Sequence, residues 1–199
     1  SKLDKEAIIR GTSIYMLDRV IPMLPKELSN GICSLNQKED RFAITVLMEI
    51  NSKGEVVSSD IQKSIIKVTR RMSYKEVQTI LDEVEGAEDK EIFNQKDKKK
   101  LLKECEPYFE HFKRMSELAN ILNQRRAKAG SLNLDIPESK ITLNEQGVAI
   151  KVEKYDMYFA NEIIEQFMLT ANETVAEKFY WLEAPFIYRV HEVPDEEKI

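Results

Sequence analysis

The chain has 199 residues, a mass of 23.2 kDa, a formal net charge of −5 and a pI of about 5.3. Its length predicts one domain, and its 42% hydrophobic and 33% charged residues are typical of a folded globular chain rather than a disordered one. The acidic balance excludes a strongly basic protein that wraps nucleic acid, but it does not exclude a local basic groove.

The sequence gives no sign of membrane insertion or of a disulfide framework. It contains no run of 18 apolar residues and does not open with a signal-peptide pattern. Cys33 and Cys105 have no CxxC partner, so we expect two reduced thiols. These observations predict a cytoplasmic protein without a membrane partner.

The first forty residues contain few regular elements. Residues 1–13 mix charged and small polar side chains and show no clear start of a helix or strand. Pro22 and Pro25 exclude a helix interior, so Ile21–Pro25 is predicted to be a rigid, extended and buried crossing. The Asn30–Gly31 pair indicates a turn or a single helical turn within Leu28–Leu35.

The next forty residues carry the strongest patterns. Arg41–Asn51 and Glu55–Val68 flank a short turn at Ser52–Gly54, which predicts a β-hairpin whose second strand is bulged. A helix is expected from Ser73 to Val84, because Ser73 and Glu76 have the spacing of a capping box and Gly86 follows as a stop.

The second half predicts helices with a further hairpin between them. The run Lys98–Lys100 is interpreted as a phosphate contact or, more simply, as the solvated start of a helix. The elements expected after it are a long amphipathic helix over Pro107–Lys128, an extended stretch over Leu132–Glu138, a hairpin of Lys140–Leu143 and Val148–Val152, a helix over Asn161–Trp181 and a strand over Phe186–His191. This order predicts an α+β fold with an antiparallel or mixed β-sheet and surrounding helices.

No complete active site can be assembled from the residues alone. The chain has no GxGxxG, P-loop, GxSxG or HExxH motif, and no aspartate has another within three residues. The acidic tracts Asp82–Glu85 and Asp195–Glu197 are interpreted as solvated helix ends. Arg189 and His191 would point to one face of a terminal strand, where they could contact phosphate or form an ordinary surface pair.

Tyrosines beside basic residues are a weak indication of nucleic-acid binding. Tyr15 lies near Arg10 and Arg19, and Tyr74 follows Arg70 and Arg71. Aromatic rings beside cations are typical of single-strand binding surfaces, where each stacked base contributes about 1–3 kcal/mol.

Several stretches together resemble the RNB catalytic domain of the RNase II / RNase R exoribonuclease family. The overall pattern is more similar to the bacterial RNase R branch than to RNase II. The stretches, in family order, are RGTSIYMLDRVIPMLPKELSNGICSL from Arg10, DRFAITVLMEI from Asp40, RRMSYKEV from Arg70, GSLNLDIPE from Gly130, IEQFMLTANETVAEKF from Ile164 and FIYRVHEVP from Phe186.

The resemblance implies a processive 3′→5′ hydrolase that degrades single-stranded RNA to nucleoside 5′-monophosphates with Mg²⁺. The family holds its metal with a D-x₅-D-x-D-D cluster that precedes the RGTSIY segment. No such cluster occurs here, so the resemblance implies that residues 1–199 are an interior part of an RNB domain, inactive alone, with no catalytic or metal-binding residue of its own. We expect a monomer as the full-length protein.

The resemblance also matches individual residues of this chain to residues that contact RNA in the family. Tyr15 matches a tyrosine that stacks on bases near the RNA 3′ end, and Tyr74 matches a tyrosine that helps distinguish RNA from DNA. Glu165 matches the acidic residue that works with it, although Gln166 stands where the family has a second glutamate. Leu134 stands where the family often has phenylalanine, and it offers no stacking face. The segment with Arg189 and His191 matches RVHE, which implies a structural or phosphate-near role.

Two other classes of function compete with the hydrolase. One is a non-enzymatic RNA-binding or scaffold protein with an RNB-like fold that has lost its metal site. The other is an interaction module that uses the long helix of residues 107–128. An exposed apolar stripe on that helix would favour the module.

Overall fold

A computed structural model describes residues 1–87, 92–131 and 138–190. The α+β class is confirmed, and the strands of these residues form three separate two-stranded antiparallel sheets rather than one larger sheet. The α-helices are α1 (Lys2–Arg10), α2 (Tyr74–Glu85), α3 (Gln95–Cys105), α4 (Phe109–Lys128) and α5 (Phe159–Trp181), with a short π-helix η1 (Glu27–Ile32) and a short 3-10 helix η2 (Glu106–Tyr108). The strands are β1 (Ile14–Tyr15), β2 (Val20–Ile21), β3 (Asp40–Ile50), β4 (Val56–Lys67), β5 (Ser139–Leu143) and β6 (Ala149–Lys154).

The long β3–β4 hairpin follows the prediction, including its bulge. Glu49 pairs with Ser58 and Ile50 pairs with Val56, so Val57 is the extra residue on the second strand. Gly54 closes the turn at φ 79°, and a Cβ there would lie 3.2 Å from the side chain of Ile121 on α4. The turn therefore needs glycine both for its backbone conformation and for the close approach of α4.

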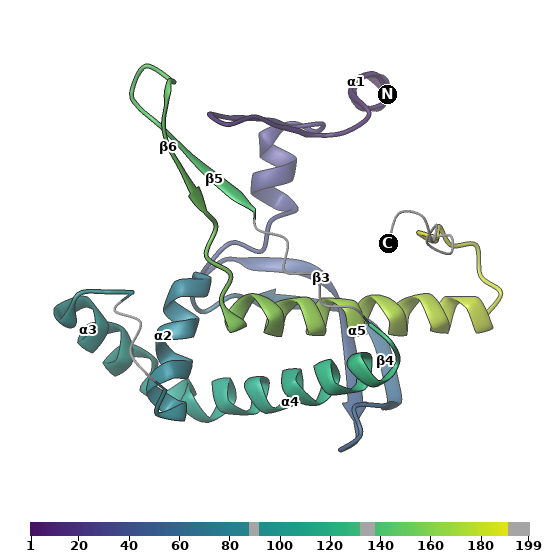
Figure 1. Ribbon diagram of the computed structural model, residues 1–199. Coiled ribbons are helices and arrows are strands. Elements are labelled where there is room, and N and C mark those ends of the chain that lie inside the picture. The colour runs from purple at the N-terminus through teal and green to yellow at the C-terminus, as the bar shows by residue number, and fades with distance from the viewer. Residues whose placement is uncertain (88–91, 132–137, 191–199) are drawn as a thin grey trace.

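Helices α2 to α5 contain the hydrophobic core of the described residues. Successive positions of α2 face two clusters of buried side chains, because Ile80 packs with Leu101 and Cys105 while Leu81 packs with Ala119 and Ile163. We call α2, α3, α4 and α5 the helical layer; they lie together in the lower half of Figure 1. Burial of these apolar faces is the main stabilising contribution to the layer.

Helix α5 covers only part of the β3–β4 hairpin. Thr174 Oγ1 lies 3.3 Å from Met48 Sδ, and Lys178 Nζ donates to the carbonyl of Ser59 at 3.3 Å. At the opposite end of the same face, Phe42 is 87% exposed and its cross-strand partner Ile65 is 67% exposed. In the described part of the chain, no other element covers this end of the apolar hairpin face.

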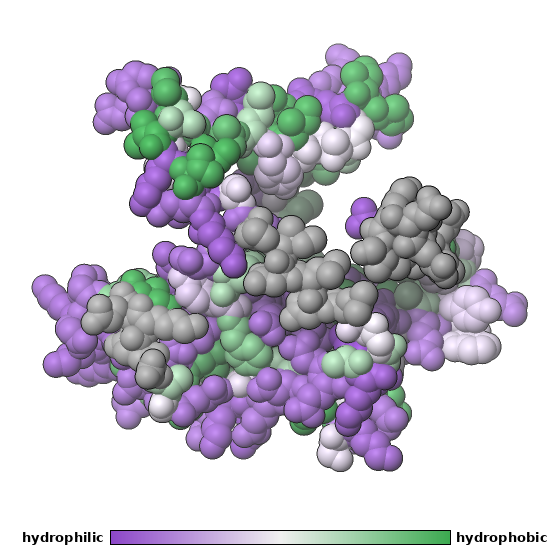
Figure 2. Space-filling model, viewed as in Figure 1, coloured by the Kyte–Doolittle hydropathy of each residue, from purple (hydrophilic) through white to green (hydrophobic). Residues whose placement is uncertain are grey.

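The remaining elements α1, β1, β2, η1, β5 and β6 form what we call the hairpin layer, above the helical layer in Figure 1. None of their residues is buried. Figure 2 shows hydrophobic side chains gathered on the surface of this layer, with a hollow between it and the helical layer. The two layers therefore differ in how well they are packed.

Three predictions about individual segments need correction. Residues 2–10 do form a helix, which Ser1 caps by accepting a hydrogen bond from the Asp4 N–H at 3.0 Å. The stretch Ile21–Pro25 starts in β2 as an extended segment, but it is half-buried to exposed rather than buried. Residues 186–190 of the predicted strand Phe186–His191 have no regular structure, because no strand in the described part of the chain pairs with them; His191 lies outside that part.

Candidate nucleic-acid interface

Tyr74 is the first residue of α2 and is 40% exposed. The predicted capping box fixes this helix start: Ser73 Oγ accepts from the Glu76 N–H at 3.3 Å, and Glu76 accepts from the Ser73 N–H at 2.7 Å. The ring of Tyr74 therefore projects from a backbone that local hydrogen bonds hold in place.

Arg70 ties this helix start to α3. Its guanidinium donates to Glu76 Oε1 at 2.7 Å and to Glu104 Oε2 at 2.7 Å, and it lies 3.8 Å from the buried Cys105 Sγ. The hydrogen bond with Glu76 raises the pKa of Arg70 above its ordinary value, while burial opposes that rise. Burial also raises the pKa of the Cys105 thiol, and the charge of Arg70 counteracts part of the increase. Arg70 is therefore engaged in structure.

Glu165 and Gln166 lie on different faces of α5. Glu165 is exposed, as are the nearby apolar side chains of Ile164 and Met168, whereas Gln166 is only 5% exposed. Within the described residues, the side-chain amide oxygen Oε1 of Gln166 has no hydrogen-bond partner. A neutral amide costs less to bury than a carboxylate would, so the position that differs from the family pattern is the buried one. Glu165 is the member of the pair that is open to solvent.

Helices α2 and α5 are joined by a buried polar link. Gln78 Nε2 donates to Asp82 Oδ1 at 2.7 Å, and Gln78 Oε1 accepts from the N–H of Ala160 at 3.1 Å. Tyr74 precedes Gln78 by one helical turn, so it lies on the side of α2 that faces the start of α5. The prediction that Asp82–Glu85 is a solvated helix end is wrong for Asp82, which is 7% exposed, whereas Glu83 and Glu85 are exposed at the end of α2.

Tyr15 belongs to the hairpin layer and is 80% exposed. Its short hairpin is attached to neighbouring segments by Ser13 Oγ, which accepts from the Met23 N–H at 3.0 Å, and by Arg10, which donates to the carbonyl of Pro22 at 3.2 Å. The tyrosine is thus presented to solvent on a small but hydrogen-bonded support.

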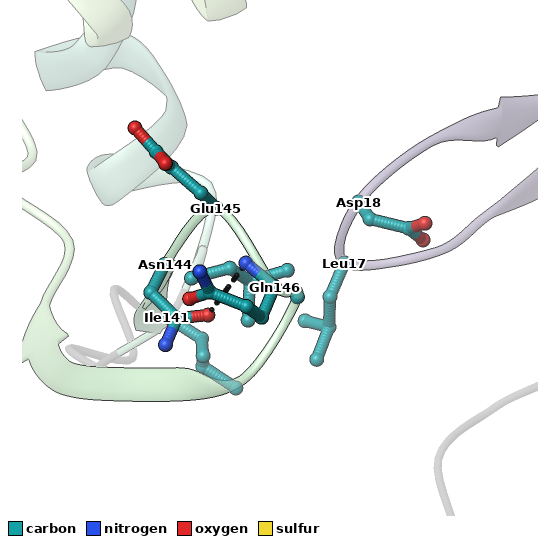
Figure 3. A pocket seen from close by; sticks show the side chains of 8 residues that line it. Leu17, Asp18, Ile141, Asn144, Glu145 and Gln146 are labelled. Atoms are coloured by element: carbon teal, nitrogen blue, oxygen red, sulfur yellow. Dashed lines mark hydrogen bonds between the residues drawn. The ribbon is translucent and has the colours of Figure 1, made fainter.

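A hollow of about 520 Å³ lies beside this support. It separates the tip of the β1–β2 hairpin, with Leu17 and Asp18, from the tip of the β5–β6 hairpin, with residues 143–147 (Figure 3). A second hollow of about 730 Å³ lies between β4 and the end of α5. Neither Tyr15 nor Tyr74 lines these two hollows, and the tyrosines lie in different layers (Figure 1).

Tyr74 and Glu165 are thus brought onto two packed helices, whereas Tyr15 stands apart from both. In the described residues, no hydrogen bond joins the hydroxyl of Tyr74 to the carboxylate of Glu165. Both groups are therefore available to a ligand. Their roles in RNA recognition stay predictions.

Two further basic segments were predicted as phosphate contacts. Arg189 is exposed and follows a small aromatic cluster in which the rings of Phe179 and Phe186 stack at 4.7 Å. Within the run Lys98–Lys100, Lys98 lies 3.3 Å from Glu83, so one member of the run is tied to α2.

The described residues do not offer a metal site. Over residues 1–87, 92–131 and 138–190, no group of three or more His, Cys, Asp or Glu side chains could hold an ion. The described residues therefore do not fit the Mg²⁺ that the family resemblance implies. Among the same residues, no helix is both long and apolar enough to cross a membrane.

Comparison with known proteins identifies the family. The family model described as RNB domain matches residues 1–199, and the chain belongs to that family. It is 42% identical to ribonuclease R 1 of Lactococcus lactis, over all of this chain and 23% of that protein. It is also 42% identical to ribonuclease R of Thermotoga maritima, over all of this chain and 26% of that protein.

A solved structure shares the fold as well. Mycoplasma genitalium RNase R in complex with ribose methylated single-stranded RNA matches with a TM-score of 0.78 and 28% identity, over all of this chain and 29% of that one. The chain therefore spans about a quarter of the length of the relatives it matches.

Proposed function

We propose that this chain is part of the RNA channel of a processive 3′→5′ exoribonuclease that releases nucleoside 5′-monophosphates from single-stranded RNA. Membership of the RNB family and the similarity to ribonucleases R support the reaction class. The observation that carries the channel role is the exposure of Tyr15 and Tyr74, since a tyrosine that only packs a core would be buried.

In this proposal the three exposed residues have separate tasks. Tyr15 stacks on a base near the RNA 3′ end, and its ring limits how short the final product becomes. Tyr74 and Glu165 recognise the ribose 2′-OH, which can both donate a hydrogen bond to a carboxylate and accept one from a phenol. The buried link from Gln78 to Ala160 holds the helices of Tyr74 and Glu165 together.

We also propose that residues 1–199 work only within a longer polypeptide. The accessible surface of the chain is 16324 Å². A compact monomer of 23.2 kDa would expose about 9,700 Å². The additional exposed surface includes the apolar side chains of Phe42 and Ile65, which further RNB sequence would cover. The Mg²⁺ ligands would also lie outside this chain.

The test compares the full-length protein with residues 1–199 alone. We expect the full-length protein, given Mg²⁺ and a 5′-labelled single-stranded RNA, to release mononucleotides from the 3′ end and leave one short labelled product. Residues 1–199 should release none. An RNA-binding scaffold would bind the same RNA without cutting it, and release by residues 1–199 alone would place catalytic carboxylates within them.

A further inference from the structure

Two adjacent arginines precede Tyr74, and the structure gives them opposite surroundings. Arg70 is held by Glu76 and Glu104, each at 2.7 Å. The side chain of Arg71 is exposed, and within the described parts of the chain its guanidinium makes no hydrogen bond or ion pair. One cation is therefore committed to the fold while its neighbour is open to a ligand.

The backbone of Arg71 is nevertheless fixed. Its N–H donates to Gln37 Oε1 at 3.0 Å, and Gln37 also forms a parallel bridge with Val68. The N–H of Lys38 donates to the carbonyl of Val68 at 2.7 Å. The segment that leads into α2 is thus attached to residues 37 and 38, so Arg71 presents a free charge from a preorganised backbone, which lowers the entropy cost of binding.

We propose that Arg71 binds a backbone phosphate of the RNA strand whose ribose lies at Tyr74. This inference rests on the proposed function. Three residues span at most about 10 Å between their α-carbons, so the long side chain of Arg71 can reach the phosphate next to a ribose held by Tyr74. A guanidinium offers two parallel N–H donors to phosphate oxygens, and this contact carries no information about base or sugar.

The experiment uses the full-length protein and fluorescent single-stranded oligonucleotides, with EDTA present to prevent cleavage. Binding is measured from about 50 to about 300 mM salt, because each phosphate contact contributes about 0.7 to the slope of log K against log salt for single strands. The variants are Arg71→Gln, Arg70→Gln and Lys53→Gln. Lys53 is an exposed cation in the turn between β3 and β4. The 12 residues of β4 separate it from the segment with Arg71 by about 40 Å.

Arg71→Gln should weaken binding of RNA about tenfold at low salt and make the salt slope shallower by about 0.7, with an unchanged melting temperature. DNA binding should weaken by the same factor, because both strands carry the phosphate. Lys53→Gln should change neither quantity. Arg70→Gln should instead lower the melting temperature, because Glu76 and Glu104 lose their shared partner.

Four results would overturn the proposal. Arg71→Gln could behave like Lys53→Gln, it could lower the melting temperature as Arg70→Gln does, or it could weaken RNA alone, which would indicate a sugar or base contact. In each of these cases the proposed function still stands if the unaltered protein binds single-stranded RNA. If the unaltered protein does not bind it, the proposed function fails together with the phosphate contact.

Discussion

The helical layer and the hairpin layer present aromatic side chains in two different ways. Tyr74 emerges from a helix that has buried residues, a capping box and an arginine between two carboxylates. Tyr15 emerges from a two-residue strand in a layer that has no buried residue. The packing of α2 thus fixes the backbone that carries Tyr74. The strand that carries Tyr15 has no such packing and depends on other parts of the polypeptide to hold it in place.

The largest expected effect comes from truncating one apolar side chain in each layer. Leu81→Ala in α2 should lower stability by about 2–5 kcal/mol, because it leaves a cavity beside Ala119 and Ile163. Ile8→Ala in α1 should change it by less than about 0.5 kcal/mol, since Ile8 is 72% exposed. Hydrogen exchange of α2 and α1 peptides in the full-length protein measures both. A large effect of Ile8→Ala would mean that other parts of the full-length polypeptide cover α1.

The next effect concerns the innermost stacking contact. Tyr15→Ala should lengthen the final product of RNA digestion, because about 1–3 kcal/mol of base stacking is lost. Gel analysis of the labelled product measures its length. Tyr15→Phe keeps the ring and should leave the length unchanged, so an unaltered product from Tyr15→Ala counts against the stacking role.

A smaller effect should separate the ribose contact from stacking. Tyr74→Phe removes only the hydroxyl and should reduce the preference for RNA over DNA by about two- to tenfold, the value of one neutral hydrogen bond. Product length should stay the same. Tyr108→Phe is the matched control, because Tyr108 is 47% exposed and lies in η2. Equal discrimination in Tyr74→Phe and the unaltered protein would refute the role.

The smallest effect is a pH dependence confined to the start of α2. Burial raises the pKa of Glu76, but hydrogen bonds from Ser73 and Arg70 outweigh it, so the pKa lies below its ordinary 4.5. A depressed pKa adds stability that is present above the ordinary value and is lost as the pH falls through the folded value.

Melting temperatures between about pH 3 and pH 6 should therefore fall at the acid end, and less steeply in Glu76→Gln than in the unaltered protein. Glu117→Gln is the control, because Glu117 is an exposed residue of α4 without such partners. Identical pH profiles for the unaltered protein and Glu76→Gln would show that this cap does not contribute.

Sequence patterns predicted the elements whose ends are fixed by neighbouring residues. Helix α2 begins after Ser73 and ends before Gly86 as expected, and the β3–β4 hairpin has the predicted turn and a bulge in its second strand. The sequence pattern does not predict α1, because its apolar residues Ile8 and Ile9 are adjacent and form no stripe. The local signal for this helix is Ser1, which caps it through the N–H of Asp4 three residues later.

Features that depend on distant partners could not be predicted from sequence patterns. Asp82 is buried because Gln78 binds both it and Ala160, which lies 82 residues beyond Gln78. The apolar stretch after Phe186 alternates like a strand, but strand formation needs a neighbour, and among the described residues none pairs with residues 186–190. The contrast between Arg70 and Arg71 depends on Glu104 of α3 in the same way.

The bare end of the β3–β4 hairpin has a consequence for synthesis in the cell. When this stretch leaves the ribosome, Phe42, Ile44 and Ile65 and the free backbone edges of both strands are open to other nascent chains. Unpaired edges beside apolar side chains are templates for aggregation. Chaperone occupancy during translation should therefore peak after residue 67 has emerged.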